Sequence, residues 1–336
     1  MNWRAEIAEW GLVPDFMIRS GIRGLLRGRL QKESAASTDI VPAMLKSPLA
    51  LGADLANAQH YELPADFFKR TLGAHLKYSS ALWDDGAEDL DAAEEAMLRL
   101  TCERAGIEDG MKVLDLGCGW GSTTLWIAEN YGSCRITAVS NSSSQREHIE
   151  AEAERRGFDG IEVLTADMNE FDTDQRFDRI VSVEMIEHMR NYRLLLQRIA
   201  SWLGPEGKLF VHIFCHRELA YFFEIDGDDD WMARYFFTGG MMPSFDLFDR
   251  FTEHLSVAKR WKVNGNNYAR TLRAWLNLFD VRHDDILEIF RSVYGASMAR
   301  RWIRRWRMFF MACEELFAYG GGEEWMVGHY LLERSQ

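Results

Sequence analysis

The sequence predicts an α/β protein built around a parallel sheet, and three observations support that prediction. From residue 111 onward, short β-rich runs alternate with helical ones, a pattern typical of parallel strands joined by crossover helices. Residues 113–131 run from an apolar strand through a turn with glycines at alternate positions into a helix. The chain has 336 residues, of which 47% are hydrophobic and only 6 are proline, so it can bury a large core.

The expected elements follow in chain order. Residues 1–110 are expected to be mostly helical, with a loop rich in Ser and Ala over 31–38. We then expect parallel strands at 112–115, 135–140, 161–166, 177–183 and 208–214. The helices between them are expected at 123–131, 144–157 and 192–203. A turn at 204–207 precedes the fifth strand, and a basic helix at 299–319 precedes a last strand at 325–332.

Residues 215–300 interrupt the alternation and are unusually aromatic and acidic. In open α/β folds, ligands bind at the carboxyl ends of the strands, so we expect this segment to form an aromatic lid over that edge. The predicted division is an N-terminal helical cap at 1–76, a ligand-binding core at 77–214, the lid insertion at 215–300, and a C-terminal helix and strand at 301–336 that complete the core.

Composition excludes several classes of function. A net charge of −13 argues against a nucleic-acid partner, which needs a basic surface. The 5 cysteines form no CxxC pair, which suits a reducing compartment. We find no signal-peptide pattern and no apolar run approaching ~18 residues, so we expect a cytoplasmic protein without a membrane span.

We expect no bound metal. Asp226, Asp228 and Asp230 have the spacing that opens a calcium loop. However, Trp231 stands where that loop needs glycine, and Phe237 where it needs its closing carboxylate. A solvated acidic loop is the favoured interpretation.

The turn after the first strand carries the strongest ligand signal. Gly117, Gly119 and Gly121 allow unusual backbone dihedrals and close approach of a ligand, and Asp115 ends the strand before them. Backbone N–H groups at the N-terminus of the following helix are suited to binding a carboxylate. The turn lacks the last glycine of the dinucleotide fingerprint and the Lys-Ser/Thr of a phosphate loop. It therefore indicates a different, nucleotide-like cofactor.

Polar residues also follow the second and third strands. Asn141 and Gln145 carry amides that can bind ribose hydroxyls without adding charge, although this serine-rich stretch also suits a helix N-cap. Asp167 and Met168 offer an acceptor and an apolar contact for adenine, and the alternative is that Asp167 caps a helix. Both alternatives stay open at this point.

Together these stretches resemble the cyclopropane-fatty-acid synthase superfamily of S-adenosylmethionine (SAM) dependent methyltransferases. The resemblance rests on residues 77–79, 115–121, 140–145 and 184–189, and it extends from about residue 60 to the C-terminus. Residues 229–231, 235–244, 268–271 and 322–326 are similar to the coclaurine N-methyltransferase branch. The resemblance implies a class I methyltransferase with a Rossmann-like sheet, SAM as methyl donor, S-adenosylhomocysteine as product, and Tyr78 and Ser79 closing over the SAM carboxylate.

An acid–base cluster follows the fourth strand. Glu184, Glu187 and His188 are expected at the edge of the sheet where the methyl group would emerge. An aliphatic amine, with a pKa near that of lysine (~10.4), arrives mostly protonated at neutral pH. We therefore expect Glu184 to bind the ammonium and Glu187 and His188 to act as general base. The alternative is that one carboxylate caps a helix and His188 packs against the sheet.

The other branch of the superfamily offers a second function. Cyclopropane synthases methylate an alkene in a lipid chain and use bicarbonate as base. By resemblance, the bicarbonate ligands would be Glu187, His212 and Tyr268, with Cys313 also important and Ser80 replacing the usual cysteine. The expected acceptor is therefore a small aromatic amine or, alternatively, an unsaturated acyl lipid.

Two basic segments bear on the choice of partner. Arginines recur at 18–30 and 299–311 among apolar residues, a pattern of helices that lie on anionic membranes. Since the chain is acidic overall, salt-bridged packing helices are favoured, while peripheral lipid contact and a homodimer are left open.

Overall fold

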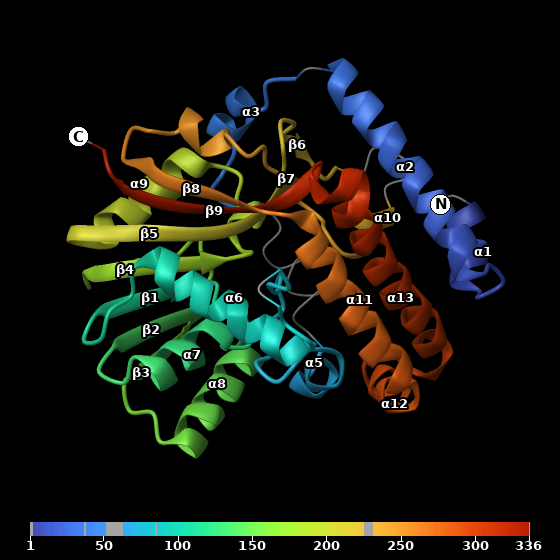
Figure 1. The fold of residues 1–336 in the computed structure, drawn as a ribbon, viewed down its shortest axis with the longest axis horizontal. Helices are drawn as coiled ribbons and strands as arrows, with labels where there is room; N and C mark the ends of the chain where they lie inside the picture. Colours follow the sequence, from blue (N-terminus) through green and yellow to red (C-terminus); the bar gives the residue numbers. More distant parts are fainter. Residues whose placement is uncertain (1–2, 37, 52–62, 85, 225–230, 336) are drawn as a thin grey trace.

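The computed structural model describes residues 3–36, 38–51, 63–84, 86–224 and 231–335. Its core is a seven-stranded sheet with the order β3-β2-β1-β4-β5-β9-β8 (Figure 1). The strands are β1 Lys112–Leu116, β2 Arg135–Ser140, β3 Ile161–Thr165, β4 Phe177–Val183, β5 Leu203–His216, β8 Leu255–Val263 and β9 Trp325–Arg334. Strands β1 to β5 pair in parallel, and β9 runs antiparallel between β5 and β8. The predicted α/β class is confirmed.

The expected alternation of strands and crossover helices is present. The helices are α7 Ser122–Asn130, α8 Ser143–Arg156 and α9 Tyr192–Trp202. Ser142 caps α8 by accepting a hydrogen bond from the backbone N–H of Gln145, and Gly157 ends the helix in the left-handed conformation. Strand β5 starts earlier than expected, because the predicted turn at 204–207 lies within it.

The sheet buries both of its faces, because neighbouring residues of each strand point in opposite directions. Val113 packs on one face with residues of α6 (Leu90–Ala105) and α7. Leu114 packs on the other face with residues of α3 (Val41–Lys46) and α9. The near-continuous apolar character of the central strands follows from this two-sided burial.

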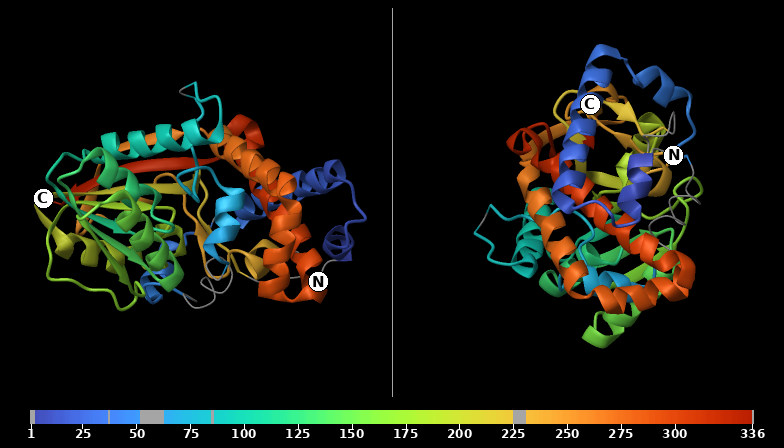
Figure 2. Two further views of the ribbon diagram at one scale, coloured as in Figure 1. Left: turned by 90° about the horizontal axis from the view of Figure 1, so that it is seen from below. Right: turned by 90° about the vertical axis from the view of Figure 1, so that its right-hand side faces the viewer.

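A layer of helices lies beyond the carboxyl ends of the parallel strands (Figures 1 and 2). It contains α5 Ala65–Thr71, α11 Gly265–Val281, α12 His283–Tyr294 and α13 Ala296–Ala318, with α1 Trp3–Glu9 and α2 Asp15–Ala36 outermost. Arg19 of α2 binds Glu314 and Glu315 of α13 at 2.8 and 2.9 Å, and Arg307 of α13 binds Asp15 of α2 at 2.9 Å. Both basic segments therefore contribute to helices that pack through ion pairs, the alternative that the sequence favoured.

Two expectations about secondary structure were wrong. The loop expected at 31–38 is mostly helix, since α2 continues to Ala36 through strong helix formers and an i,i+4 pair of Arg29 with Glu33 at 3.1 Å. Strand β8 was not expected, because Lys259, Arg260 and Lys262 give this edge strand the composition of a surface loop.

The segment 215–300 contributes to more than one part of the fold. It includes β8 of the main sheet as well as α11 and α12. Near the carboxyl edge it forms β6 Tyr221–Phe222, α10 Trp231–Tyr235 and β7 Met241–Met242. Of the 3₁₀ helices in the described part of the chain, η3 Leu247–Arg250 lies in this segment, while η2 Ile186–His188 and η4 Tyr319–Gly322 lie outside it. The division into four units stays a prediction, and the aspartates of the acidic loop lie outside the described residues.

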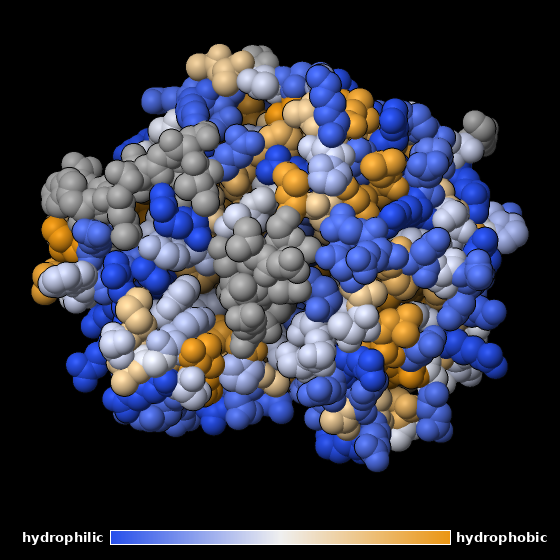
Figure 3. Space-filling view, turned by 180° about the vertical axis from the view of Figure 1, so that it is seen from behind, coloured by the Kyte–Doolittle hydropathy of each residue, from blue (hydrophilic) through white to orange (hydrophobic). Residues whose placement is uncertain are grey.

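The surface gives limited information about partners. Figure 3 shows a face on which hydrophilic residues predominate and apolar residues form smaller groups between them. Within the described ranges, none of the helices has the length and apolar character needed to cross a bilayer. The same ranges contain no cluster of His, Cys, Asp and Glu that could hold a metal ion.

Candidate active site

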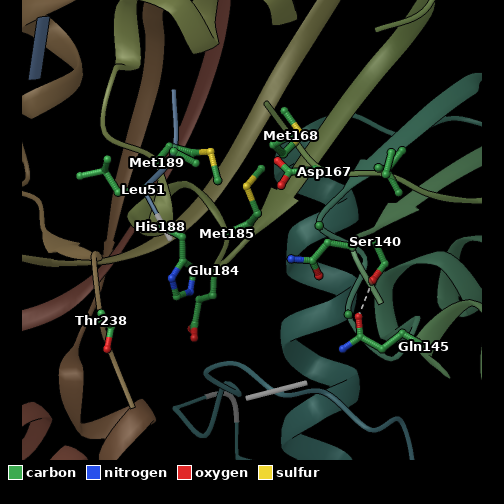
Figure 4. A pocket seen from close by; sticks show the side chains of 16 residues that line it. Leu51, Ser140, Gln145, Asp167, Met168, Glu184, Met185, His188, Met189 and Thr238 are labelled. Atoms are coloured by element: carbon green, nitrogen blue, oxygen red, sulfur yellow. Dashed lines mark hydrogen bonds between the residues drawn. The ribbon is translucent and has the colours of Figure 1, made fainter. Parts of the chain in front are cut away.

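Two adjoining cavities open at the carboxyl ends of β1 to β4, and Figure 4 shows the first of them. They share four lining residues: Gly117, Gly119, Gln145 and Glu184. The first cavity is further lined by Ala50, Leu51, Val139, Ser140, Asn141, Ala166, Asp167, Met168, Met185, His188, Met189 and Thr238. The second is further lined by Leu76, Tyr78, Ser79, Asp115, Cys118, Trp120, Ser122, Thr123 and Val183. All ten predicted cofactor residues except Gly121 therefore line this site.

Glycine is needed at the three positions of the turn for different structural reasons. All have positive φ, which side chains other than glycine rarely adopt. A Cβ at Gly117 would lie 2.5 Å from Cγ of Met185, and one at Gly121 would lie 2.6 Å from Cγ1 of Ile149. A Cβ at Gly119 would meet no described atom within 4 Å. Gly117 and Gly121 are thus required by packing, whereas Gly119 leaves open space that a ligand can approach.

Gln145 presents an unused hydrogen-bond donor to the site. The hydroxyl of Ser140 donates to Oε1 of Gln145 at 2.6 Å, which fixes the orientation of the amide. Nε2 of Gln145 is buried and has no partner among the described residues. Buried donors are normally satisfied, so this amide fits a wall that binds a polar ligand. The N-cap role belongs to Ser142, whereas Asn141 and Gln145 line the cavity.

Asp115 and Asp167 differ in their surroundings. Asp115 is buried and accepts a hydrogen bond from the Thr124 hydroxyl at 2.6 Å, and burial raises its pKa to about 6. Asp167 accepts from the backbone N–H and the side-chain amide of Asn169 at 2.7 and 3.0 Å, which orients its carboxylate at the cavity. Asp115 therefore links the end of β1 to the start of α7 across the glycine turn, and Asp167 lines the first cavity.

Glu184 has a carboxylate that is fixed by three hydrogen-bond partners. Its Oε1 accepts from the backbone N–H of Ser80 at 3.0 Å and contacts Nε2 of His212 at 3.2 Å, and its Oε2 accepts from the hydroxyl of Tyr268 at 2.5 Å. Its φ of +47° is a strained conformation for a residue with a side chain. Burial raises the pKa of Glu184, while the hydrogen bond from Tyr268 and the charge of Lys77 oppose that rise.

Lys77 and Glu94 complete this charged region, and the sequence analysis assigned no role to either. Nζ of Lys77 is buried and donates to the hydroxyl of Ser79 at 2.5 Å and to the carbonyl of Ser80 at 2.8 Å. Burial lowers the pKa of Lys77 to about 8, and the charges of Glu184 and Glu94 limit that fall. The only signal in the sequence was that Lys77 adjoins the Tyr78-Ser79 stretch.

The predicted acid–base trio is only partly brought together. Glu184 and His188 both project into the first cavity (Figure 4). The ring of His188 stacks on Phe237, with centroids 5.6 Å apart and planes 8° from parallel. Glu187 lines neither cavity: its side chain is buried, and its Oε2 lacks a partner within the described ranges. Burial and the charge of Glu184 raise the pKa of Glu187 well above its usual value.

Three of the residues that the resemblance assigned to bicarbonate already form hydrogen bonds with Glu184. The backbone N–H of Ser80, the ring of His212 and the hydroxyl of Tyr268 all bind the carboxylate of Glu184. Burial raises the pKa of the Cys313 thiol, so this cysteine stays protonated. A bicarbonate ion would therefore compete with a side-chain carboxylate for these three donors.

Comparisons with known proteins agree with this architecture. The model of the family described as mycolic acid cyclopropane synthetase matches residues 53–323. (S)-coclaurine N-methyltransferase of Thalictrum flavum subsp. glaucum is 39% identical over 97% of this chain and 94% of its own length. A crystal structure of coclaurine N-methyltransferase bound to N-methylheliamine and SAH superposes with a TM-score of 0.93 at 38% identity, covering 98% of each chain. Cyclopropane-fatty-acyl-phospholipid synthase of Escherichia coli strain K12 is 30% identical over 81% of this chain and 67% of its own length.

Proposed function

The chain belongs to the mycolic acid cyclopropane synthetase family and is a SAM-dependent methyltransferase, and we propose that it methylates the nitrogen of a small amine that carries an aromatic ring. The family resemblance and the class I methyltransferase fold predicted from the sequence are confirmed by these matches. The full-length similarity to coclaurine N-methyltransferases supports nitrogen as the acceptor atom.

The cofactor position in this proposal follows the glycine turn. Gly119, Asn141, Gln145, Asp167 and Met168 would hold SAM, with Tyr78 and Ser79 at the opposite side, because these residues line one continuous site. SAM supplies a methyl group on a positively charged sulfur. The unused amide donor of Gln145 and the open space at Gly119 support this placement.

The observation that supports the proposed reaction most directly is that Glu184 and His188 line the same cavity. An acceptor amine arrives mainly as an ammonium ion, which an ionised Glu184 would attract and orient. His188 would then accept the proton and so expose the nitrogen lone pair. Glu187, which the sequence pairs with His188 as general base, is buried outside both cavities, and its raised pKa favours the protonated form, so it takes no part in this step. Phe237 stacks on His188 and so helps to fix the orientation of its ring.

Orientation of the acceptor is expected to contribute more than proton removal. Positioning of two reactants contributes roughly 7–11 kcal/mol in favourable cases, whereas general base catalysis contributes typically ~10²–10⁴-fold, or about 3–5 kcal/mol. Loss of the base should therefore slow the reaction strongly without abolishing it.

The pKa of the acceptor provides the test. Turnover of His188→Asn and of the unaltered protein is measured with a series of amines of decreasing pKa. Amines that arrive neutral need no base, so the defect of His188→Asn should shrink along the series. A defect of constant size would remove the general-base assignment, and the absence of turnover on every amine would remove N-methylation itself.

The lipid-modifying alternative is tested separately. Methylation of unsaturated acyl phospholipids that depends on added bicarbonate would favour it. The occupation of the Ser80, His212 and Tyr268 donors by Glu184 argues against that outcome.

A further inference from the structure

A chain of four side chains leads from the cavity through the sheet to helix α6. Nε2 of His212 lies 3.2 Å from Oε1 of Glu184, and Nδ1 of His212 lies 2.9 Å from Nε2 of His329. Nδ1 of His329 lies 2.8 Å from Nη1 of Arg104. His212 and His329 face each other in the register of β5 and β9, and both rings are fully buried. The guanidinium of Arg104 also lies over the ring of Trp261, 5.0 Å from its centroid.

The chemistry of arginine fixes the direction of every bond in this chain. A guanidinium can only donate, so Nδ1 of His329 must accept and carries no proton. The neutral ring then holds its proton on Nε2 and donates it to Nδ1 of His212. His212 in turn must hold its proton on Nε2, which donates to Glu184. Burial and the nearby charges of Arg104 and Lys77 lower the pKa of both histidines well below its usual value, in agreement with neutral rings.

We propose that Arg104 is a positioning residue that acts through His329 and His212 to hold Glu184 as an ionised hydrogen-bond acceptor. The proposal rests on the proposed role of Glu184 as the ammonium-binding carboxylate. It adds a residue that lines neither cavity and that lies on a helix outside the sheet.

The direction of the chain also excludes it as an exit route for the substrate proton. His212 already carries a proton on the nitrogen that faces Glu184, so it has no lone pair to receive another. Proton transfer from Glu184 outward would require both rings to reverse their tautomers against the charge of Arg104. The chain therefore holds the carboxylate and does not conduct protons away from it.

Without Arg104 the two histidines could reverse. Each ring would then hold its proton on Nδ1, and His212 would turn a lone pair toward Glu184, which favours the protonated carboxyl group. The other ionisable groups that face Glu184 are Lys77, Glu187, His188, Tyr268 and Cys313. The contacts of Arg104 are instead to His329 and Trp261, so we expect a change at Arg104 to leave these groups in place. Loss of the arginine should consequently weaken binding of the cationic acceptor.

The tautomers are the direct test. The full-length protein is labelled with ¹⁵N at its 9 histidines. NMR spectra are recorded of the unaltered protein, of Arg104→Met and of Arg104→Lys. The resonances of His329 and His212 are assigned with His329→Gln and His212→Gln. We expect both rings as Nε2–H tautomers in the unaltered protein, a change of this pattern in Arg104→Met, and its retention in Arg104→Lys, which keeps a cationic donor. Arg99→Met, on an exposed position of the same helix, should leave the spectrum unchanged.

Kinetics connect the chain to the reaction. In Arg104→Met we expect KM for the amine to rise and kcat to fall by about tenfold, the order of effect of losing a hydrogen bond to a charged group, with the Kd of SAM unchanged. An Nδ1–H or doubly protonated ring in the unaltered protein would overturn the proposal, as would a normal KM and kcat despite reversed tautomers. If Glu184→Gln methylates amines with normal KM and kcat, the proposed role of Glu184 fails, while the tautomer result still reports on the hydrogen-bonded chain. If the unaltered protein turns over no amine, the proposed function itself fails.

Discussion

The two walls of the cavity are built in different ways. The glycine wall, at the ends of β1 to β3, consists of Gly117, Gly119, Asn141, Gln145 and Asp167, and its polar groups are backbone, amides and one oriented carboxylate. The charged wall, after the end of β4, presents Glu184 and His188 to the cavity, and Lys77, His212 and Tyr268 support Glu184 from behind. Neutral dipoles suit a ligand that carries both charges, whereas buried ionisable groups suit control of a proton and a cation. The comparison teaches that one wall provides shape and the other provides charge.

Removal of the carboxylate charge from the charged wall should have the largest effect. We expect Glu184→Gln to lower kcat/KM for the amine by about 10²–10⁴-fold, since the amide keeps the shape but loses the attraction for ammonium. Steady-state kinetics check this, and calorimetry should find SAM binding within a few-fold of the unaltered protein. A large loss of SAM affinity would show that the two walls are not separable.

Asp115, beneath the glycine wall, should give a pH-dependent effect on stability. Its folded pKa of about 6 lies above the ordinary 3.8, so the folded state keeps its proton to higher pH than the unfolded state does. The contribution is therefore fully favourable below pH 3.8 and is lost as pH rises to about 6, by up to about 3 kcal/mol. Asp115→Asn keeps an acceptor for Thr124 and should remove this loss.

Urea unfolding of both proteins between pH 4 and 8 measures this difference. The gain in unfolding free energy of Asp115→Asn over the unaltered protein should grow between pH 4 and pH 6 and stay constant above it. A difference that does not change with pH would contradict a raised pKa for Asp115.

The shape of the glycine wall is tested at two glycines. Gly119→Ala points into open space, so it should fold with a cost of about 1–2 kcal/mol from its φ of +53° and weaken SAM binding by about tenfold or more. Gly117→Ala is the matched control, because its Cβ would collide with Met185 and should destabilise the fold instead. Thermal unfolding and SAM titration of the pair distinguish the two roles. Unchanged SAM affinity in Gly119→Ala would place the cofactor elsewhere.

The smallest effect is expected from a single donor of the charged wall. Tyr268→Phe removes the hydroxyl that donates to Oε2 of Glu184 but keeps the ring that stacks on Phe317. We expect kcat/KM to fall by about tenfold, since the backbone N–H of Ser80 and the ring of His212 still hold the carboxylate. A loss as large as that of Glu184→Gln would mean that the hydroxyl itself contacts the acceptor.

The two walls also differ in how far sequence could predict them. Residues of the glycine wall follow directly after strands with clear periodicity, so Gly119, Asn141 and Asp167 could be placed at one edge from topology alone. Strand β8 was not predicted, because a charged edge strand lacks the alternation of apolar and polar residues that indicates a strand. In the charged wall, Glu184 and His188 were predicted, but the partners of Glu184 lie up to 104 residues away in the chain.

His329 and Arg104 had no local signal of function at all. His329 is one residue in an apolar strand, and only its register opposite His212 gives it a role. The burial of Glu187 away from the cavity depends on the 3₁₀ turn of η2, which residue order does not specify. Long-range register and local backbone geometry therefore account for what the sequence could not predict.

The central claim is that an ionised Glu184 binds the cation of the acceptor beside His188. The most direct measurement is the affinity of SAH-saturated protein for an amine and for its neutral carbon isostere, compared between the unaltered protein and Glu184→Gln. We predict that the unaltered protein prefers the cation and that Glu184→Gln loses this preference. An equal preference in both proteins would contradict the account.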